Sequence, residues 1–131
     1  MGFWRKKALP PEQKARNARW DRFIGTICFR PLATLSTVQR TAVLCFWYDA
    51  EMNSGGHSGY FDCYPDTDPE ELARAIAEVS HQDIADNYRM AVSDGEKDGF
   101  QAADTAYYDF SPSLSEYLME FVEQHSGEIF A

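Results

Sequence analysis

The chain has 131 residues, of which 44% are hydrophobic and 25% charged, and it carries a formal net charge of −9. This length fits one domain with a single core, and the composition disfavours a disordered chain. The longest apolar run, residues 42–48, is far shorter than the roughly 20 residues of a membrane-spanning helix, so we expect a soluble protein.

The cysteines and the first residues indicate a cytoplasmic protein. Cys28, Cys45 and Cys63 are odd in number and form no Cys-x-x-Cys pair, so a disulfide framework is not expected and we predict structural roles for all three. Residues 1–7 are basic, but no apolar segment follows them, and they do not predict a secretory signal.

The net charge conceals a division along the chain. Residues 1–40 hold nine Lys and Arg against two acids, whereas residues 41–131 hold three against nineteen, which leaves this second part with a charge of −16. A segment this acidic repels nucleic acid and attracts basic surfaces. The alternative interpretation is that the acids only keep a helical protein soluble.

The first predicted helix covers residues 12–30 and is basic and amphipathic, with its apolar side chains at three-and-four spacing. Pro10-Pro11 marks its start, and Pro31 ends it because the residue before a proline avoids helical geometry. The charge division and this helix predict an N-terminal helix and linker over residues 1–33 and an acidic helical domain over residues 34–131.

The second predicted helix, residues 36–52, is apolar enough to be the central core helix, with Phe46 on its buried face. Gly55-Gly56 then supplies a flexible C-terminal stop. After the glycines, Tyr60 and Phe61 fit a short helical turn that packs onto the core.

Two more helices have recognisable start signals. Asp68 is the expected N-cap of one, with Glu71 placed for a capping box and Leu72 and Ile76 on its buried stripe. Residues 80–83 repeat this signal for the next helix, whose core face is predicted to include Ile84, Tyr88 and Val92.

Residues 94–111 have no regular pattern and predict turns with an aromatic cluster. Ser111-Pro112 marks the start of a final helix that buries Leu118 and Phe121. No segment alternates with a period of two. We therefore predict an all-α, single-domain helical bundle of about six or seven helices with irregular packing, in which Leu72, Ile76, Leu118 and Phe121 share one core with Phe46.

Metal binding and catalysis both lack a convincing motif. The segment from Asp94 to Gly99 resembles the start of a calcium loop, but Thr105 stands where the bidentate Glu is needed, which favours a solvated turn. The three histidines are far apart, so no metal and no cofactor is expected. Neither Ser58 nor Cys63 lies in a nucleophile motif, and we predict that the protein is not an enzyme.

The most informative stretch runs from residue 51 to residue 61, Glu-Met-Asn-Ser-Gly-Gly-His-Ser-Gly-Tyr-Phe. It resembles the signature of the DNA-mimic (DMP-type) protein family, long classed as a domain of unknown function, whose pattern is Glu-x-Asn-Asn-Gly-Gly-Phe followed by an aromatic pair. Asp104-x-x-Tyr107-Tyr108 and the segment 117–121 resemble the family's C-terminal part. The sequence departs from the pattern with Ser54, His57 and Gly59. The matched motif residues are Glu51, Asn53, Gly55, Gly56, Tyr60 and Phe61.

This resemblance covers about residues 34–130 and implies an all-α fold that often self-associates, so a homodimer is one partner to consider. It also implies a function, the presentation of acidic side chains to a DNA-binding protein. From the residues alone, the motif is first a structural corner, in which glycines allow positive φ and Asn53 bonds neighbouring backbone. A small-ligand or enzymatic role for this corner, through Asn53 and His57, is the less favoured alternative.

We expect the chain to be an acidic protein-binding module and a candidate DNA mimic for a basic, DNA-binding regulator. The alternative is an immunity-type inhibitor of a basic enzyme such as a nuclease. Under both hypotheses we expect no binding to nucleic acid and none to a membrane. The acidic side chains expected to contact the partner are predicted on exposed helix faces, and they are Glu71, Glu78, Asp83, Asp86, Glu116, Glu120 and Glu123.

Overall fold

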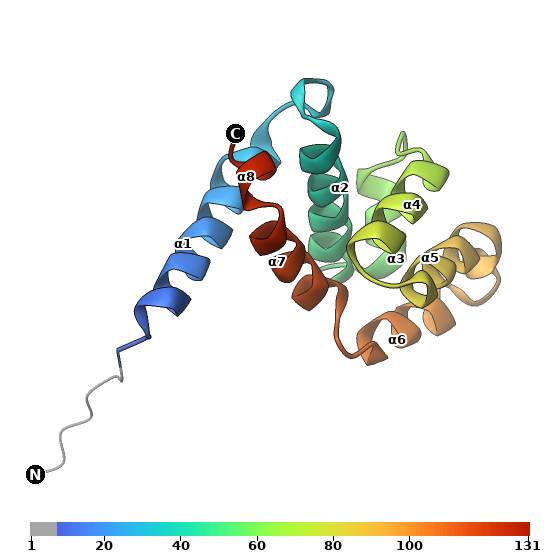
Figure 1. Cartoon of the computed structure of the whole chain (residues 1–131). Helices are drawn as coiled ribbons and strands as arrows, with labels where there is room; N and C mark the ends of the chain where they lie inside the picture. Colours follow the sequence, from blue (N-terminus) through green and yellow to red (C-terminus); the bar gives the residue numbers. More distant parts are fainter. Residues whose placement is uncertain (1–7) are drawn as a thin grey trace, which may run out of the picture.

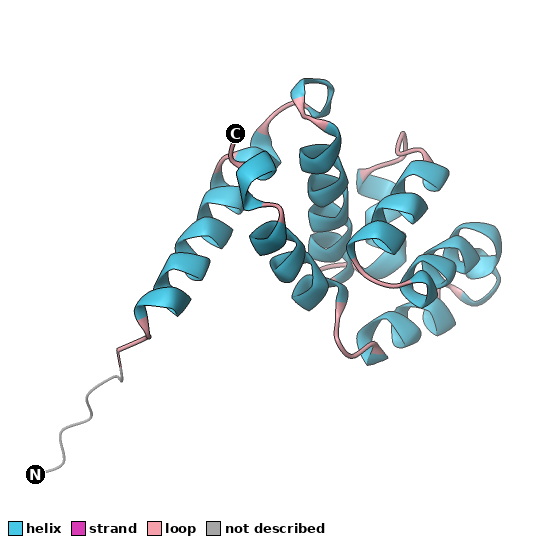
Figure 2. Ribbon diagram, in the orientation of Figure 1, coloured by secondary structure: helices cyan, strands magenta, loops and turns pink. Residues whose placement is uncertain are grey.

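The computed structural model describes residues 8–131, so the basic residues 1–7 considered above lie outside the described part. Within residues 8–131 the chain forms eight α-helices and three 3-10 helices, with no strand (Figure 2). The all-α prediction is confirmed, with more helices than expected. The helices are α1 Pro11–Gly25, α2 Thr37–Met52, α3 Gly56–Cys63, α4 Pro69–Val79, α5 Gln82–Asp94, α6 Gln101–Asp109, α7 Leu114–Gln124 and α8 Ser126–Ile129, and the 3-10 helices are η1 Ile27–Phe29, η2 Leu32–Thr34 and η3 Gly95–Asp98.

Helix α2 is the centre of the fold. Figure 1 shows it between α7 and α1 on one side and α3 and α4 on the other. Its N-terminus carries a full capping box. The Ser36 hydroxyl accepts a hydrogen bond from the Gln39 backbone N–H, and the Gln39 side chain accepts one from the Ser36 backbone N–H. The prediction of a central core helix is confirmed.

The first helix is shorter than predicted. Helix α1 ends at Gly25, and the chain continues through η1 and η2 before α2 begins. Phe23 is completely buried, and its ring packs edge-on against Phe46 at 6.0 Å between centroids. This contact attaches α1 to the core.

The start signals of α4 and α5 are partly confirmed. Asp68 caps α4 by accepting from the Glu70 backbone N–H, but Glu71 does not form the predicted capping box because its carboxylate pairs with Arg40 of α2. At α5 the cap is His81, which accepts from the Asp83 backbone N–H.

The prediction of irregular structure over residues 94–111 is wrong. Helix α6 occupies most of it, reached through Gly99 and Phe100, which both have φ of 64°. A positive φ is uncommon for a residue such as Phe100, so the sequence gives no sign that a helix starts there. Helix α7 starts slightly later than predicted, with Ser113 as cap in a capping box with Glu116.

The predicted core is confirmed. Leu72, Ile76, Leu118 and Phe121 are buried in one cluster, and Phe46 packs against it. Val92 is an exception, because its side chain is exposed at the end of α5. No helix in residues 8–131 is long and apolar enough to cross a membrane.

Candidate functional site

The corner after α2 is held by a buried chain of hydrogen bonds. His57 donates to Asp104 Oδ1 of α6 twice, from its backbone N–H at 3.0 Å and from Nδ1–H at 2.6 Å. Its Nε2 accepts from the Tyr48 hydroxyl of α2 at 2.5 Å. A carboxylate at Nδ1 selects the tautomer that leaves Nε2 free to accept. Three helices therefore meet at one histidine.

The backbone conformation of this corner requires a glycine at position 56. Its φ is +67°, and a Cβ at this position would lie 2.5 Å from Asp104 Oδ2. Both facts demand glycine, as the motif suggested. The pair Gly55-Gly56 does not act as the predicted stop of α2, however: Asn53 is the C-cap of α2, and Gly55 is the N-cap of α3.

Asn53 bonds the helix end as predicted. Its amide donates to the Asp49 carbonyl at 2.9 Å and to the Asp49 carboxylate at 3.3 Å. Tyr107 of α6 donates to the same carboxylate, and Tyr108 donates to the Met52 carbonyl. Desolvation raises the pKa of Asp49, while the bonds from Tyr107 and Asn53 oppose this shift.

The His57 ring is closed to solvent, although Asp104 is partly exposed. The side chains of Tyr48 and His57 are both fully buried. Burial lowers the pKa of His57, against the raising effect of Asp104, and burial raises the pKa of Tyr48. With neither Tyr48 nor His57 accessible to a substrate, this arrangement positions α6 against the corner.

The two candidate nucleophiles considered from the sequence, Ser58 and Cys63, are not activated. Ser58 is exposed, but within residues 8–131 it forms no hydrogen bond with a histidine. The pKa of the Cys63 thiol is raised, first by desolvation and then by the nearby Glu51, which keeps the thiol protonated. These features supply no activated nucleophile.

The motif after α2 and the Asp-x-x-Tyr-Tyr pattern on α6 thus form one structural unit. The sequence matches the family described as DMP19-like protein over residues 33–125, which is more than half of the chain. The chain belongs to the DMP19-like protein family. No curated protein and no solved structure matches it.

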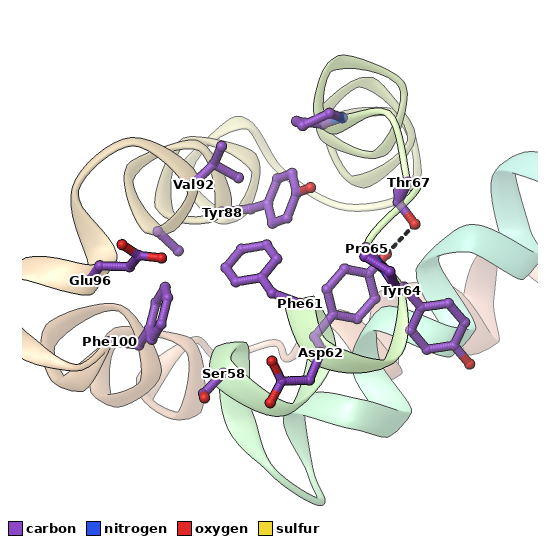
Figure 3. Close-up of a pocket in the computed structure, with 13 residues that line it drawn as sticks. Ser58, Phe61, Asp62, Tyr64, Pro65, Thr67, Tyr88, Val92, Glu96 and Phe100 are labelled. Carbon is purple, nitrogen blue, oxygen red and sulfur yellow. Dashed lines mark hydrogen bonds between the residues drawn. The ribbon is translucent and has the colours of Figure 1, made fainter.

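The DMP19-like region has a cleft beside the corner, with a volume of about 430 Å³. It lies between α3 and α5 and extends to Phe100, and its inner surface is aromatic. Figure 3 shows Phe61 pointing into the space between Tyr88 and Phe100, with the Glu96 carboxylate directed toward the same space. Two motif residues, Tyr60 and Phe61, therefore contribute to its wall.

The acidic side chains predicted on α4 and α5 have different surroundings. Glu71 is half-buried in its pair with Arg40, and Asp86 accepts from Gln82 at 2.8 Å and lies 3.8 Å from Arg89. Glu78 is exposed with no ion pair to Lys or Arg in the described chain, and within the same residues the Asp83 carboxylate forms an ion pair with His81 alone, at 3.6 Å. Glu78 and Asp83 are thus open to a partner.

The acidic row of α7 is not open in the same way. The helical pattern placed Glu116, Glu120 and Glu123 on the outward face, but α1 of the DMP19-like chain packs beside this helix. Arg16 bonds Glu120 at 2.6 Å, and Arg19 bonds Glu123 with two contacts, at 2.8 and 2.6 Å. The Arg19 hydrogen bond lowers the pKa of Glu123.

Glu116 caps the N-terminus of its own helix, α7. Its side chain accepts from the Ser113 backbone N–H and completes the capping box of α7. None of these three contacts of Glu116, Glu120 and Glu123 was predicted from the sequence. One signal was present, because Arg16 and Arg19 have the same three-residue spacing as Glu120 and Glu123.

The segment from Asp94 to Gly99, which resembles the start of a calcium loop, forms a compact turn. Asp94 pairs with Lys97 at 2.7 Å, and Asp98 accepts from the Ala102 backbone N–H at 3.0 Å. In the part of the chain that the structure describes, no three His, Cys, Asp or Glu side chains come together as metal ligands. The turn is held by its own residues.

Proposed function

We propose that this protein is an acidic binding module for a basic, DNA-binding protein. DNA-binding proteins gain much of their affinity from phosphate charge, so an array of carboxylates can compete for the same surface. Membership of the DMP19-like family and the charge of −16 over residues 41–131 both support this function.

The observation that carries the proposal is the pairing of α1 with α7. Within one chain, a basic helix lies on an acidic helix, and arginines three residues apart meet carboxylates three residues apart. Paired arginine–carboxylate contacts of this kind resemble the contacts that arginines make with phosphates. The acidic row of α7 therefore has the geometry to receive a basic helix.

This pairing has a consequence for the partner. While Arg16 and Arg19 of α1 engage Glu120 and Glu123, two of the predicted carboxylates near the junction of α4 and α5 are exposed and form no ion pair with a Lys or Arg within residues 8–131. We call Glu78 and Asp83 the junction acids. A partner that needs the α7 row has to compete with Arg16 and Arg19, whereas a partner that uses the junction acids does not.

A small-ligand role for Asn53 and His57 has less support. The Asn53 amide is engaged with Asp49, and His57 is fully buried with both ring nitrogens bonded. The Asn53 side-chain nitrogen and both His57 ring nitrogens are thus engaged within the chain. The corner therefore supports a structural role in the first place.

The experiment is capture followed by displacement. The full chain is immobilised and incubated with lysate of its source cell, with a Glu78→Lys/Asp83→Lys variant as the matched control. We expect a DNA-binding protein that is retained by the native chain, is lost from the variant, and releases its DNA when the native chain is added.

Two outcomes would contradict the proposal. One is a captured protein that binds DNA and this chain at the same time without competition. The other is an enzyme as the only charge-dependent partner, which would favour the inhibitor alternative.

A further inference from the structure

The cleft between α3 and α5 combines aromatic rings with carboxylates. The Phe61 ring lies 5.4 Å from that of Phe100 and 6.3 Å from that of Tyr88, measured between centroids. Asp62 and Glu96 also line the cleft, and no lining residue is a Lys or Arg. Aromatic faces and carboxylates both attract a cation.

The cations nearest in sequence have other partners. Lys97, next to Glu96, pairs with Asp94 at 2.7 Å. Arg89 of α5 reaches Glu70 at 3.3 Å and Asp86 at 3.8 Å. Neither Asp62 nor Glu96 forms an ion pair within residues 8–131. The negative charge at the cleft is therefore uncompensated by the chain itself.

We propose that this cleft binds an arginine side chain of a protein partner, with the guanidinium stacked on Phe61 and paired with Glu96. Arginine fits better than lysine because its planar group stacks on rings and offers a fork of donors to a carboxylate. The volume of about 430 Å³ lies within the range of roughly 300–1,000 Å³ of ligand sites, and it accommodates the side chain with its adjoining peptide.

This inference rests on the proposed function and names the contact that anchors the partner. The junction acids Glu78 and Asp83 attract a basic surface over a distance, which affects encounter. A buried arginine in an aromatic cleft acts after encounter, as binding hot spots often do. The two regions therefore have separable effects.

The test is a titration of the full chain, observed by NMR, with the peptide acetyl-Gly-Arg-Gly-amide. The matched control peptide carries citrulline, which has the shape of arginine without its charge. We expect saturable shifts at Phe61, Tyr88 and Phe100 with the arginine peptide and none with citrulline. Equal binding of both peptides, or shifts confined to other helices, would overturn the proposal.

Variants of the chain identify the site. Glu96→Gln removes an exposed carboxylate, and it should weaken arginine-peptide binding by roughly fivefold. Phe61→Leu should weaken it by about threefold or more, with a thermal melt as the check on folding. Glu78→Gln is the charge-matched control and should leave the peptide affinity unchanged. Unchanged affinity in Glu96→Gln and in a folded Phe61→Leu would refute the site.

Failure of this inference can be distinguished from failure of the proposed function. If the arginine peptide does not bind, but the junction-acid variant still loses its DNA-binding partner, only the arginine cleft is wrong. If the peptide binds in the cleft and no basic partner exists, the proposed function is wrong and the cleft remains.

Discussion

Asp104 accepts two hydrogen bonds from His57 on one oxygen, and this pair ties α6 to the start of α3. Replacing Asp104 with Ala leaves a buried backbone N–H and a buried ring N–H without a partner. We expect a loss of about 1–3 kcal/mol in the free energy of unfolding, measured by urea denaturation. Asp109→Ala, an exposed site on the same helix, is the control and should change little. Equal effects of the two variants would show that the His57 bonds contribute nothing.

Gly56 and Gly59 make a matched pair within α3. Gly56→Ala places a methyl against Asp104 at a positive φ, so we expect destabilisation of about 1–3 kcal/mol. Gly59→Ala meets only the Glu51 carboxylate at 3.9 Å, and it should stabilise the helix by roughly 0.4–1 kcal/mol. Thermal melts of both variants check this. The account of the corner fails if Gly56→Ala is tolerated as well as Gly59→Ala.

The buried His57 predicts a pH dependence. Its pKa is lowered by burial from the ordinary value of 6.5, while Tyr48 and Tyr107, whose pKa values are raised, stay neutral beside it. The unfolded chain therefore binds a proton at a higher pH than the folded chain. Stability from this group is fully present above about pH 6.5 and decreases as the pH falls below it.

The measurement is the free energy of unfolding between pH 7.5 and pH 5.5. We expect a decrease over this range in the native chain and a smaller one in His57→Gln. A native profile in His57→Gln would contradict the assignment.

The arginines of α1 should regulate access to α7. In Arg16→Gln/Arg19→Gln, Glu120 and Glu123 lose their partners, so a hexa-arginine peptide should bind more tightly at low salt, and the gain should disappear at high salt. The control is Lys14→Gln/Arg30→Gln, which removes the same charge from residues with no ion pair in the described chain. If both variants gain equally, net charge alone explains the effect.

Local signals in the sequence predicted much of the fold. The cap at Asp68 and the apolar stripes of α2, α4 and α7 depend on neighbouring residues, so they could be predicted directly from the sequence. Helix α6 could not, because its entry through Phe100 in a left-handed conformation contradicts the usual preference of that residue.

The candidate site depended on contacts across the chain. His57 and Asp104 are 47 residues apart, and Arg16 and Glu120 are 104 apart, so neither pair is visible in any sequence window. The glycine motif could be recognised, but the sequence did not reveal which carboxylate it faces. The predicted acidic set also mixed exposed side chains with Glu71, Glu120 and Glu123, which arginines of the same chain engage.

The most direct test of the central claim is the association rate constant between this protein and its captured DNA-binding partner, compared for the native chain and the Glu78→Lys/Asp83→Lys variant. Exposed charges steer encounter but contribute little to folding, so the rate should fall by about tenfold or more at low salt while the melting temperature stays close to native. The difference between the two proteins should shrink as salt is added. An unchanged rate constant in a folded variant would contradict the claim that acidic side chains of this protein imitate DNA.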